Sequence, residues 1–179
     1  LSAFIKDLGF TDDYCKRDLA IAIIENKHDI IKDFTSSTLS AFIKDLGFTD
    51  DHKKGSLAIA IIENKHDIIN DLTSSTLSAF IKDLGFTDDY YKTDLAIAII
   101  EQNPEIINDL TSSIALSDFI IDKLKVTDDP NKKDLAIAII ENKHDAIKDL
   151  TSSTLSAFIK DLGFTDDYCK RDLAIAIIE

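Results

Sequence analysis

Runs of apolar residues return at a regular interval along the chain, and a shorter apolar pair follows each run. The first run is Leu19–Ile24, and the pair Ile30-Ile31 follows it. The same stretch recurs with few changes at 57–72, 95–110 and 135–150, and in part at 173–179. Successive apolar residues leave no polar face, so each run predicts an element that is buried on several sides.

A second apolar stripe precedes each run. Leu1, Phe4, Ile5 and Leu8 fall at helical spacing, which predicts a first helix over Leu1–Leu8. Gly9 ends this helix, because glycine adopts the left-handed conformation at little cost. In later copies a Thr-Ser-Ser-Thr stretch precedes the stripe, and its hydroxyl groups are suited to capping the first turn.

A polar connector, Thr11–Arg17, joins the stripe to the apolar run. We expect a second helix at Leu19–Asn26 with Asp18 as its N-cap, because Asp or Ser stands there in every copy. A short buried strand is the alternative for this run, since its pattern does not separate the two. A third helix is expected at Asp29–Phe34. Its start is clearest in Asn103-Pro104-Glu105, which supplies an N-cap, a first-turn proline and an acid.

Two copies of the connector contain a residue that disfavours a helix. Gly55 and Pro130 both fall within the connector, and both are costly inside a helix, so the connector is predicted to be a loop or a first turn. The segment Thr11-Asp12-Asp13 is expected to form one capped turn, with its acids at the positive end of the helix dipole.

These elements form tandem units. Residues 1–38, 39–76 and 77–114 are nearly identical, 115–154 is a divergent fourth unit, and 155–179 repeats 1–25 without change. One unit alone cannot bury this much apolar surface, whereas stacked units cover one another. The predicted fold is therefore all-α: one continuous array over 1–179, a solenoid of about 38-residue units with three short helices each. The restart at 155 predicts a higher-order repeat of residues 1–154, and we expect the chain to be a window on a longer array.

The fourth unit departs from the pattern in its first helix. It contains an extra residue at Ala115 and has Lys125 where the other units have glycine. We expect these changes to lengthen this helix and to alter the local stacking angle. If the whole 154-residue block is copied, this irregularity recurs at a fixed spacing.

Two resemblances to known repeat families follow from these motifs. Leu19, Ile21, Ala22, Asn26, His28, Ile30 and Ile31 follow the pattern of the ankyrin helix–turn–helix, which the stretch resembles. In the third unit, Phe80–Asp89 followed by Ala96–Leu110 is similar to the mitochondrial transcription termination factor repeat, which has three short helices and a proline near the third. Both resemblances imply a helical solenoid.

Composition narrows the classes of partner and compartment. The net charge is −13, with 33 acidic and 20 basic residues, so nucleic acid is not an expected partner. No apolar run reaches membrane-spanning length, so membrane insertion is not expected. Cys15 and Cys169 occupy the same place in duplicated segments, which excludes a disulfide framework. A disulfide between two chains through this cysteine is the remaining alternative. The localisation is unknown, with the cytoplasm favoured over secretion.

The sequence contains little catalytic or ligand-binding chemistry. His28, His66 and His144 recur in the turn after the apolar run. In the third unit Pro104 stands in place of this histidine, so we expect the histidines to have a structural role in the turn. Asp12-Asp13 suggests calcium, but Arg17 and Ile23 stand where an EF-hand loop requires glycine and glutamate. We therefore predict no catalytic residue, no cofactor and no metal site. Weak divalent binding between stacked acidic turns stays open.

Near-identical units predict a structural function: a rod, superhelix or filament built by repeat stacking and self-association. The alternative is an ankyrin-like module that binds a protein partner through the variable connector. Cys15 lies beside Lys16 and Arg17, basic residues that favour a reactive thiol, so a cross-linking role is the alternative to an incidental surface thiol. The possible partner contacts are Tyr14, Cys15, Arg17, His52, Lys53, Tyr90, Tyr91, Asn131 and Lys132.

Overall fold

A computed structural model describes residues 1–142 and 152–178 of the chain. Within these residues the structure is all-helical and contains no strand, so the predicted helix class is confirmed and the alternative of a short buried strand is excluded. The predicted third helix of the fourth unit and His144 lie outside the described residues.

Short and long helices alternate along the chain. The helices of the first row are α1 (Ser2–Asp7), α3 (Ser36–Leu46), α5 (Ser74–Leu84), α7 (Ser113–Asp118) and α9 (Ser152–Asp161). Those of the second row are α2 (Asp13–Asn26), α4 (Asp51–Asn64), α6 (Asp89–Gln102), α8 (Asp129–Asn142) and α10 (Asp167–Ile178).

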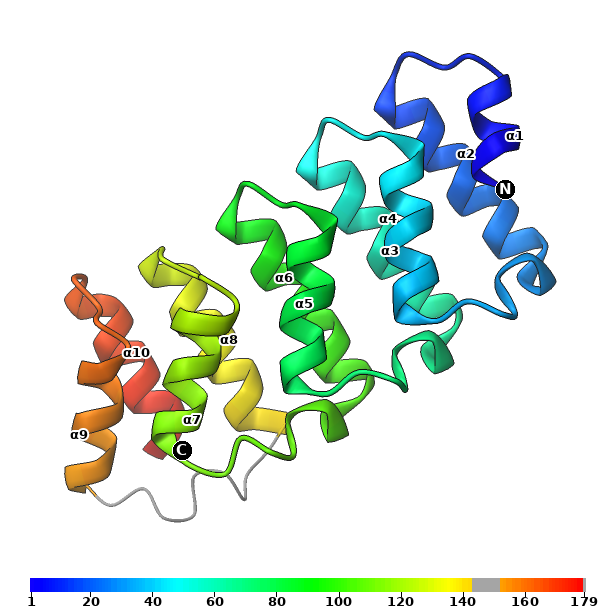
Figure 1. Cartoon of the computed structure of the whole chain (residues 1–179). Helices are drawn as coiled ribbons and strands as arrows, with labels where there is room; N and C mark the ends of the chain where they lie inside the picture. Colours follow the sequence, from blue (N-terminus) through cyan, green and yellow to red (C-terminus); the bar gives the residue numbers. More distant parts are fainter. Residues whose placement is uncertain (143–151, 179) are drawn as a thin grey trace.

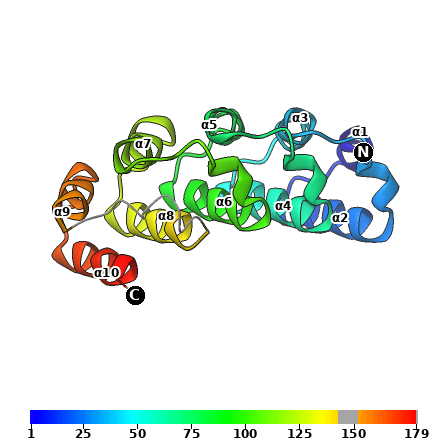
Figure 2. The same cartoon turned by 90° about the horizontal axis from the view of Figure 1, so that it is seen from below.

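The two kinds of helix form two layers, which Figure 2 shows from below. Each long helix packs against the next long helix, and the short helices lie beside one another in the same order (Figure 1). The core runs continuously between the layers, where Leu57, Ile61, Leu95 and Ile99 are fully buried. A helix pair therefore gains its buried surface from the pairs on either side.

The second helix of each unit starts earlier than the sequence predicted. Asp12, and not Asp18, is the N-cap of α2, and its carboxylate accepts a hydrogen bond from the Tyr14 N–H at 2.7 Å. The predicted capped turn at Thr11–Asp13 is thus the true helix start. The connector is helical from Asp13 onward. Its second copy includes Gly55 inside the helix, where a loop or first turn was predicted, whereas Pro130 lies in the first turn as expected.

In the first three units, the third element is a single 3-10 turn rather than an α-helix such as the predicted Asp29–Phe34. The three described copies are His28–Ile31, His66–Ile69 and Pro104–Ile107. In the third copy, the Asn103 side chain caps the turn and Pro104 occupies its first position, as predicted. The second and third copies bury both of their isoleucines against the core, whereas the first copy buries Ile31 and leaves Ile30 exposed. Each turn then redirects the chain toward the next short helix.

The short helices have the predicted caps. Thr35 and Thr73 each form a capping box with the threonine three residues later. Gly47 and Gly85 end α3 and α5 with φ of 65° and 66°, in the left-handed region that glycine adopts without strain. The first helix is observed at Ser2–Asp7, within the predicted range Leu1–Leu8.

In the fourth unit, two extra residues are absorbed without shifting the core. The cap moves to Ser112, so that the Leu116 N–H bonds to the Ser112 carbonyl at 3.0 Å as Leu77 bonds to Thr73 at 2.7 Å. The helix is not lengthened. Its α-helical part shrinks to 6 residues, and a π-helical turn, Phe119–Lys123, follows. Lys125 then takes the left-handed position with φ of 56°. The predicted change in stacking angle stays a prediction.

Candidate functional site: the junctions between units

One aspartate joins each unit to the next. Asp13 lies in the first turn of α2, and its Oδ2 accepts hydrogen bonds from the Thr49 N–H at 2.7 Å and the Thr49 hydroxyl at 2.9 Å. The Asp50 N–H also donates to it at 3.2 Å. The other oxygen, Oδ1, accepts from the Lys16 ammonium at 3.0 Å. We call this set of contacts the carboxylate clamp.

The carboxylate clamp is repeated at every junction that the described residues contain. Asp51 accepts from Thr87 and Asp88, Asp89 from Thr127 and Asp128, and Asp129 from Thr165 and Asp166, all within 2.6–3.2 Å. The lysine of three clamps also reaches a backbone carbonyl of the next unit: Lys54 to Gly85, Lys92 to Lys125 and Lys132 to Leu162. The clamp satisfies backbone N–H groups at the start of the next long helix, which have no partner within that helix.

The clamp holds its aspartates ionised. Burial alone raises the pKa of the Asp51 carboxyl, but hydrogen bonds from Lys54, Thr87 and Asp88 outweigh this effect and lower the pKa to about 2. The same balance lowers the pKa of Asp13 and Asp89 to about 2 and also lowers the pKa of Asp129. A carboxylate that accepts several charge-assisted or backbone hydrogen bonds is favoured in its charged form.

The variable connector positions also meet across the junctions. The Lys53 ammonium lies 3.6 Å from the centre of the Tyr14 ring of the preceding unit, and the Tyr91 ring lies 5.7 Å from that of His52. Tyr91 also packs edge-on against Tyr90, at 5.1 Å between ring centres. The first of these is a cation–π contact and the others are aromatic contacts. These residues therefore face neighbouring units as well as solvent.

The predicted partner contacts divide into exposed and buried residues. Tyr14, Cys15, His52 and Tyr90 are exposed, while Arg17, Tyr91 and Asn131 are half-buried. Lys53 and Lys132, by contrast, are buried and do not lie open to a partner in this arrangement. The physical reason is that the connector is helical and packs between units, and Lys132 is the lysine of a carboxylate clamp.

The two cysteines differ although their local sequences are the same. Cys15 is exposed and Cys169 is buried, and both are free thiols. Burial and the nearby Asp166 carboxylate raise the pKa of the Cys169 thiol. This direction is opposite to the activation suggested by the neighbouring basic residues, because Cys169 is buried in α10, the helix that packs against α8.

A row of ion pairs runs along the short helices and stops at the fourth unit. Lys6 pairs with Asp45, and Lys44 pairs with Asp83 at 2.6 Å. At the next step the π turn displaces Asp122, which lies 3.6 Å from Lys125 of its own unit. No ion pair between Lys82 and the fourth unit occurs among the described residues.

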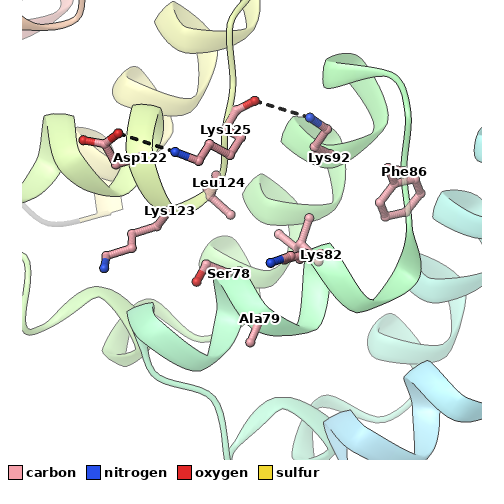
Figure 3. Close-up of a pocket in the computed structure, with 10 residues that line it drawn as sticks. Ser78, Ala79, Lys82, Phe86, Lys92, Asp122, Lys123, Leu124 and Lys125 are labelled. Atoms are coloured by element: carbon pink, nitrogen blue, oxygen red, sulfur yellow. Dashed lines mark hydrogen bonds and ion pairs between the residues drawn. The ribbon is translucent and has the colours of Figure 1, made fainter.

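A surface pocket occupies the place of the missing ion pair. It has a volume of about 400 Å³ and lies between α5 and the π turn. Figure 3 shows Ser78 and Lys82 coming from α5, and Lys123 and Lys125 coming from the opposite side. The pocket is a local basic spot on an acidic chain, and it lies where the fourth unit departs from the regular pattern.

The described residues hold no group of three or more His, Cys, Asp or Glu side chains suited to a metal ion. His66 is exposed within a 3-10 turn. The hydroxyl groups of Thr35 and Thr73 act as helix caps. Over the same residues, no helix has the length and apolar character needed to cross a membrane.

Sequence reasoning missed the carboxylate clamp. It treated Asp13 as a helix-cap acid and did not pair it with the next unit. A signal was present: Thr-Asp-Asp, followed by lysine three residues after its last Asp, occurs in every unit even where the residues between them change. Invariant polar residues beside variable ones indicate a contact between copies.

Comparisons with protein-family models, curated proteins and solved structures found no match to this chain. The resemblances to ankyrin and to mitochondrial transcription termination factor repeats therefore stay predictions.

Proposed function

We propose that this chain is an α-solenoid with a structural function, a rod-like scaffold built by stacking of units and by self-association. The observation that carries the proposal is the carboxylate clamp. The same aspartate makes the same three contacts to the following unit at four successive junctions. Further units can be added by repeating this junction. Each unit carries both the aspartate that contacts the following unit and the Thr-Asp pair that contacts the preceding unit.

The surface supports a scaffold over a module specialised for one partner. The short helices α3 and α5 have the same sequence and differ little in exposure, so neighbouring units present the same face. Part of the variation between units is used at the junctions, where Lys53 meets Tyr14 and Tyr91 meets His52. The proposal assigns no reaction, cofactor or nucleic acid to the chain.

The test is the shape of the purified chain. A compact domain of this length has a radius of gyration of about 16 Å, whereas two layers of side-by-side helices require a larger value. We expect small-angle scattering to give an elongated particle, and negative-stain microscopy at high concentration to show curved rods or fibres. Monodisperse compact particles would contradict the proposal.

A second candidate is the protein-binding module, and one observation favours it. Tyr14, Tyr90 and Tyr168 are exposed at equivalent positions of three units. Tyrosine side chains are enriched at protein–protein interfaces. The discriminating variant replaces all three with serine. Capture of a protein partner that is lost in this variant, and kept in one with Ile114→Ser, would support binding over a purely structural function.

A further inference from the structure

The short helices carry a repeated site that holds a carboxylate of the next unit. On α3, Ser40 and Lys44 lie one helical turn apart. Both donate a hydrogen bond to the Asp83 carboxylate of α5, the lysine at 2.6 Å. These bonds from Lys44 and Ser40 lower the pKa of the Asp83 carboxyl. We call such a serine–lysine pair on a short helix an outer site.

The same arrangement occurs one unit earlier. Lys6 of α1 forms an ion pair with Asp45 of α3. Hydrogen bonds from Lys6 and Ser2 lower the pKa of the Asp45 carboxyl. Two successive outer sites therefore each hold a carboxylate that the following unit supplies.

The helix α5 carries the third outer site, Ser78 and Lys82, but the fourth unit supplies no carboxylate to it. The residue directly before the last buried leucine of the short segment is Asp83 in the third unit and Lys123 in the fourth. A lysine thus stands where the regular pattern has the acid. The Ser78 hydroxyl donates to the Ser75 carbonyl of its own helix at 2.8 Å, whereas that of Ser40 donates to Asp83.

The pocket beside the π turn therefore has an excess of positive charge. Lys92 belongs to a carboxylate clamp, and Lys125 lies 3.6 Å from Asp122. Lys82 and Lys123 also line the pocket, and neither forms an ion pair within the part of the chain that the structure describes. Two ammonium groups from two different units thus face one cavity without an acid to neutralise them.

The cavity has the size and lining of a site for a small ligand. Its volume of about 400 Å³ lies near the lower end of the range for small-molecule sites. Figure 3 shows Ser78 between the ends of Lys82 and Lys123. The buried Leu124 and the half-buried Phe86 add apolar surface to the lining. Polar groups therefore converge over a partly apolar wall.

We propose that this pocket binds a ligand with two carboxylate groups. The first carboxylate accepts hydrogen bonds from Ser78 and Lys82, as the Asp83 carboxylate does at the outer site of α3. The second carboxylate pairs with Lys123, and a short apolar spacer between the two lies against Leu124. Charge-assisted hydrogen bonds of this kind are stronger than neutral ones. The site does not depend on self-association of the chain.

The sharpest test fills the pocket from within. Lys123→Asp returns to the fourth unit the acid of the regular pattern, so that Lys82 gains an internal carboxylate. Its melting temperature should equal or exceed that of the unmodified chain, which separates loss of binding from loss of fold. Lys32→Asp is the matched control, because it makes the same change of charge at an exposed residue of the first unit.

Succinate is the probe, and binding is followed by heteronuclear NMR of the nitrogen-labelled chain at constant ionic strength. We expect succinate to shift the amide signals of the pocket in the unmodified chain and in Lys32→Asp with equal affinity. Lys123→Asp should weaken binding by more than about tenfold, because repulsion replaces attraction. Ser78→Ala should weaken it by about threefold to tenfold through the lost hydrogen bond.

Two results would overturn the site. One is the absence of shifts at the pocket. The other is a set of shifts at scattered lysines that Lys123→Asp leaves unchanged, which would show general screening of charge. Neutral succinamide should produce no shifts, and equal binding of this amide would also contradict the proposal.

A further comparison identifies the source of the carboxylates. The peptide acetyl-Asp-Asp-amide presents two acidic side chains as a protein segment does. Tighter binding of succinate supports a free dicarboxylic acid as the ligand, and tighter binding of the peptide supports an acidic protein segment. In either case Lys123→Asp should abolish the difference between the two probes, and a difference that persists in this variant would place their binding elsewhere.

Discussion

The third and fourth units solve the same packing problem with different backbones. In the third unit, α5 is a regular helix that ends at Gly85, whereas in the fourth the equivalent segment passes from α7 into a π turn and ends at Lys125. The buried positions are kept: Leu84 and Leu124 are 3% and 4% exposed. The carboxylate clamp is kept as well, because Thr127 reaches Asp89 as Thr87 reaches Asp51.

What the fourth unit loses is on the surface. The row of ion pairs along the short helices is interrupted, the helix-ending glycine is replaced, and a pocket opens beside the π turn. We infer from this difference that the spacing of the buried residues and the carboxylate clamp determine whether a unit stacks. The outer row of ion pairs is not needed for stacking. Each of the following substitutions tests one half of this statement.

The largest effect is expected in the core. Leu84→Ala and Leu124→Ala should each lower the free energy of unfolding by about 3 kcal/mol, because both remove a fully packed leucine. Urea denaturation followed by circular dichroism measures both. A much smaller loss for Leu124→Ala would mean that the π turn does not pack as tightly as the α-helix it replaces.

The clamp should matter equally at a regular and an irregular junction. Asp51→Asn and Asp89→Asn should each cost about 1–2 kcal/mol, through lost charge-assisted hydrogen bonds. The matched control is Glu101→Gln, which removes an exposed acid outside the clamp. A near-zero cost at Asp89 alone would show that the fourth unit stacks without its clamp.

The same aspartates predict a loss of stability in acid. Their pKa is lowered to about 2 in the folded chain, against about 3.9 in an unfolded chain. The stabilisation is therefore complete above about pH 4 and is lost as the pH falls toward 2. Allowing for solvent screening, each clamp contributes about 1 kcal/mol. Thermal melts between pH 5 and 2 should show a shallower decline in Asp51→Asn than in Glu101→Gln.

The helix ends should respond in opposite directions. Lys125→Gly should stabilise the chain by about 1 kcal/mol, because it relieves a left-handed residue that carries a side chain. Gly85→Ala should destabilise it by a similar amount for the same reason. Equal melting temperatures for Lys125→Gly and the unmodified chain would indicate that the fourth unit is adapted to lysine there.

The smallest effect is expected in the outer row. Asp83→Asn breaks a pair with Lys44 that is half exposed, and should cost about 0.5 kcal/mol. Asp122→Asn breaks a longer and more exposed pair within the fourth unit, and should cost less than about 0.3 kcal/mol. High salt should remove the difference between the two variants.

The sequence predicted most of the helices and few of the contacts between them. Apolar spacing and caps such as Thr35 and Gly47 are local signals, so the short helices could be located from them. The start of the long helix could not, because Asp12 and Asp18 are equally good caps. The choice depends on neighbouring units, which bury polar connector residues such as Lys53. The junction contacts join residues thirty or more positions apart, beyond the reach of any local pattern.

The short reach of the junction bonds has a consequence for how the chain is made. Side-chain hydrogen bonds between units join residues 30 to 43 positions apart, so each unit needs only its immediate neighbour. Folding can then advance behind the growing end of a nascent chain, one unit late, without waiting for distant segments. The stack would be assembled in the order of synthesis, and its most recent unit would be the least protected from unfolding.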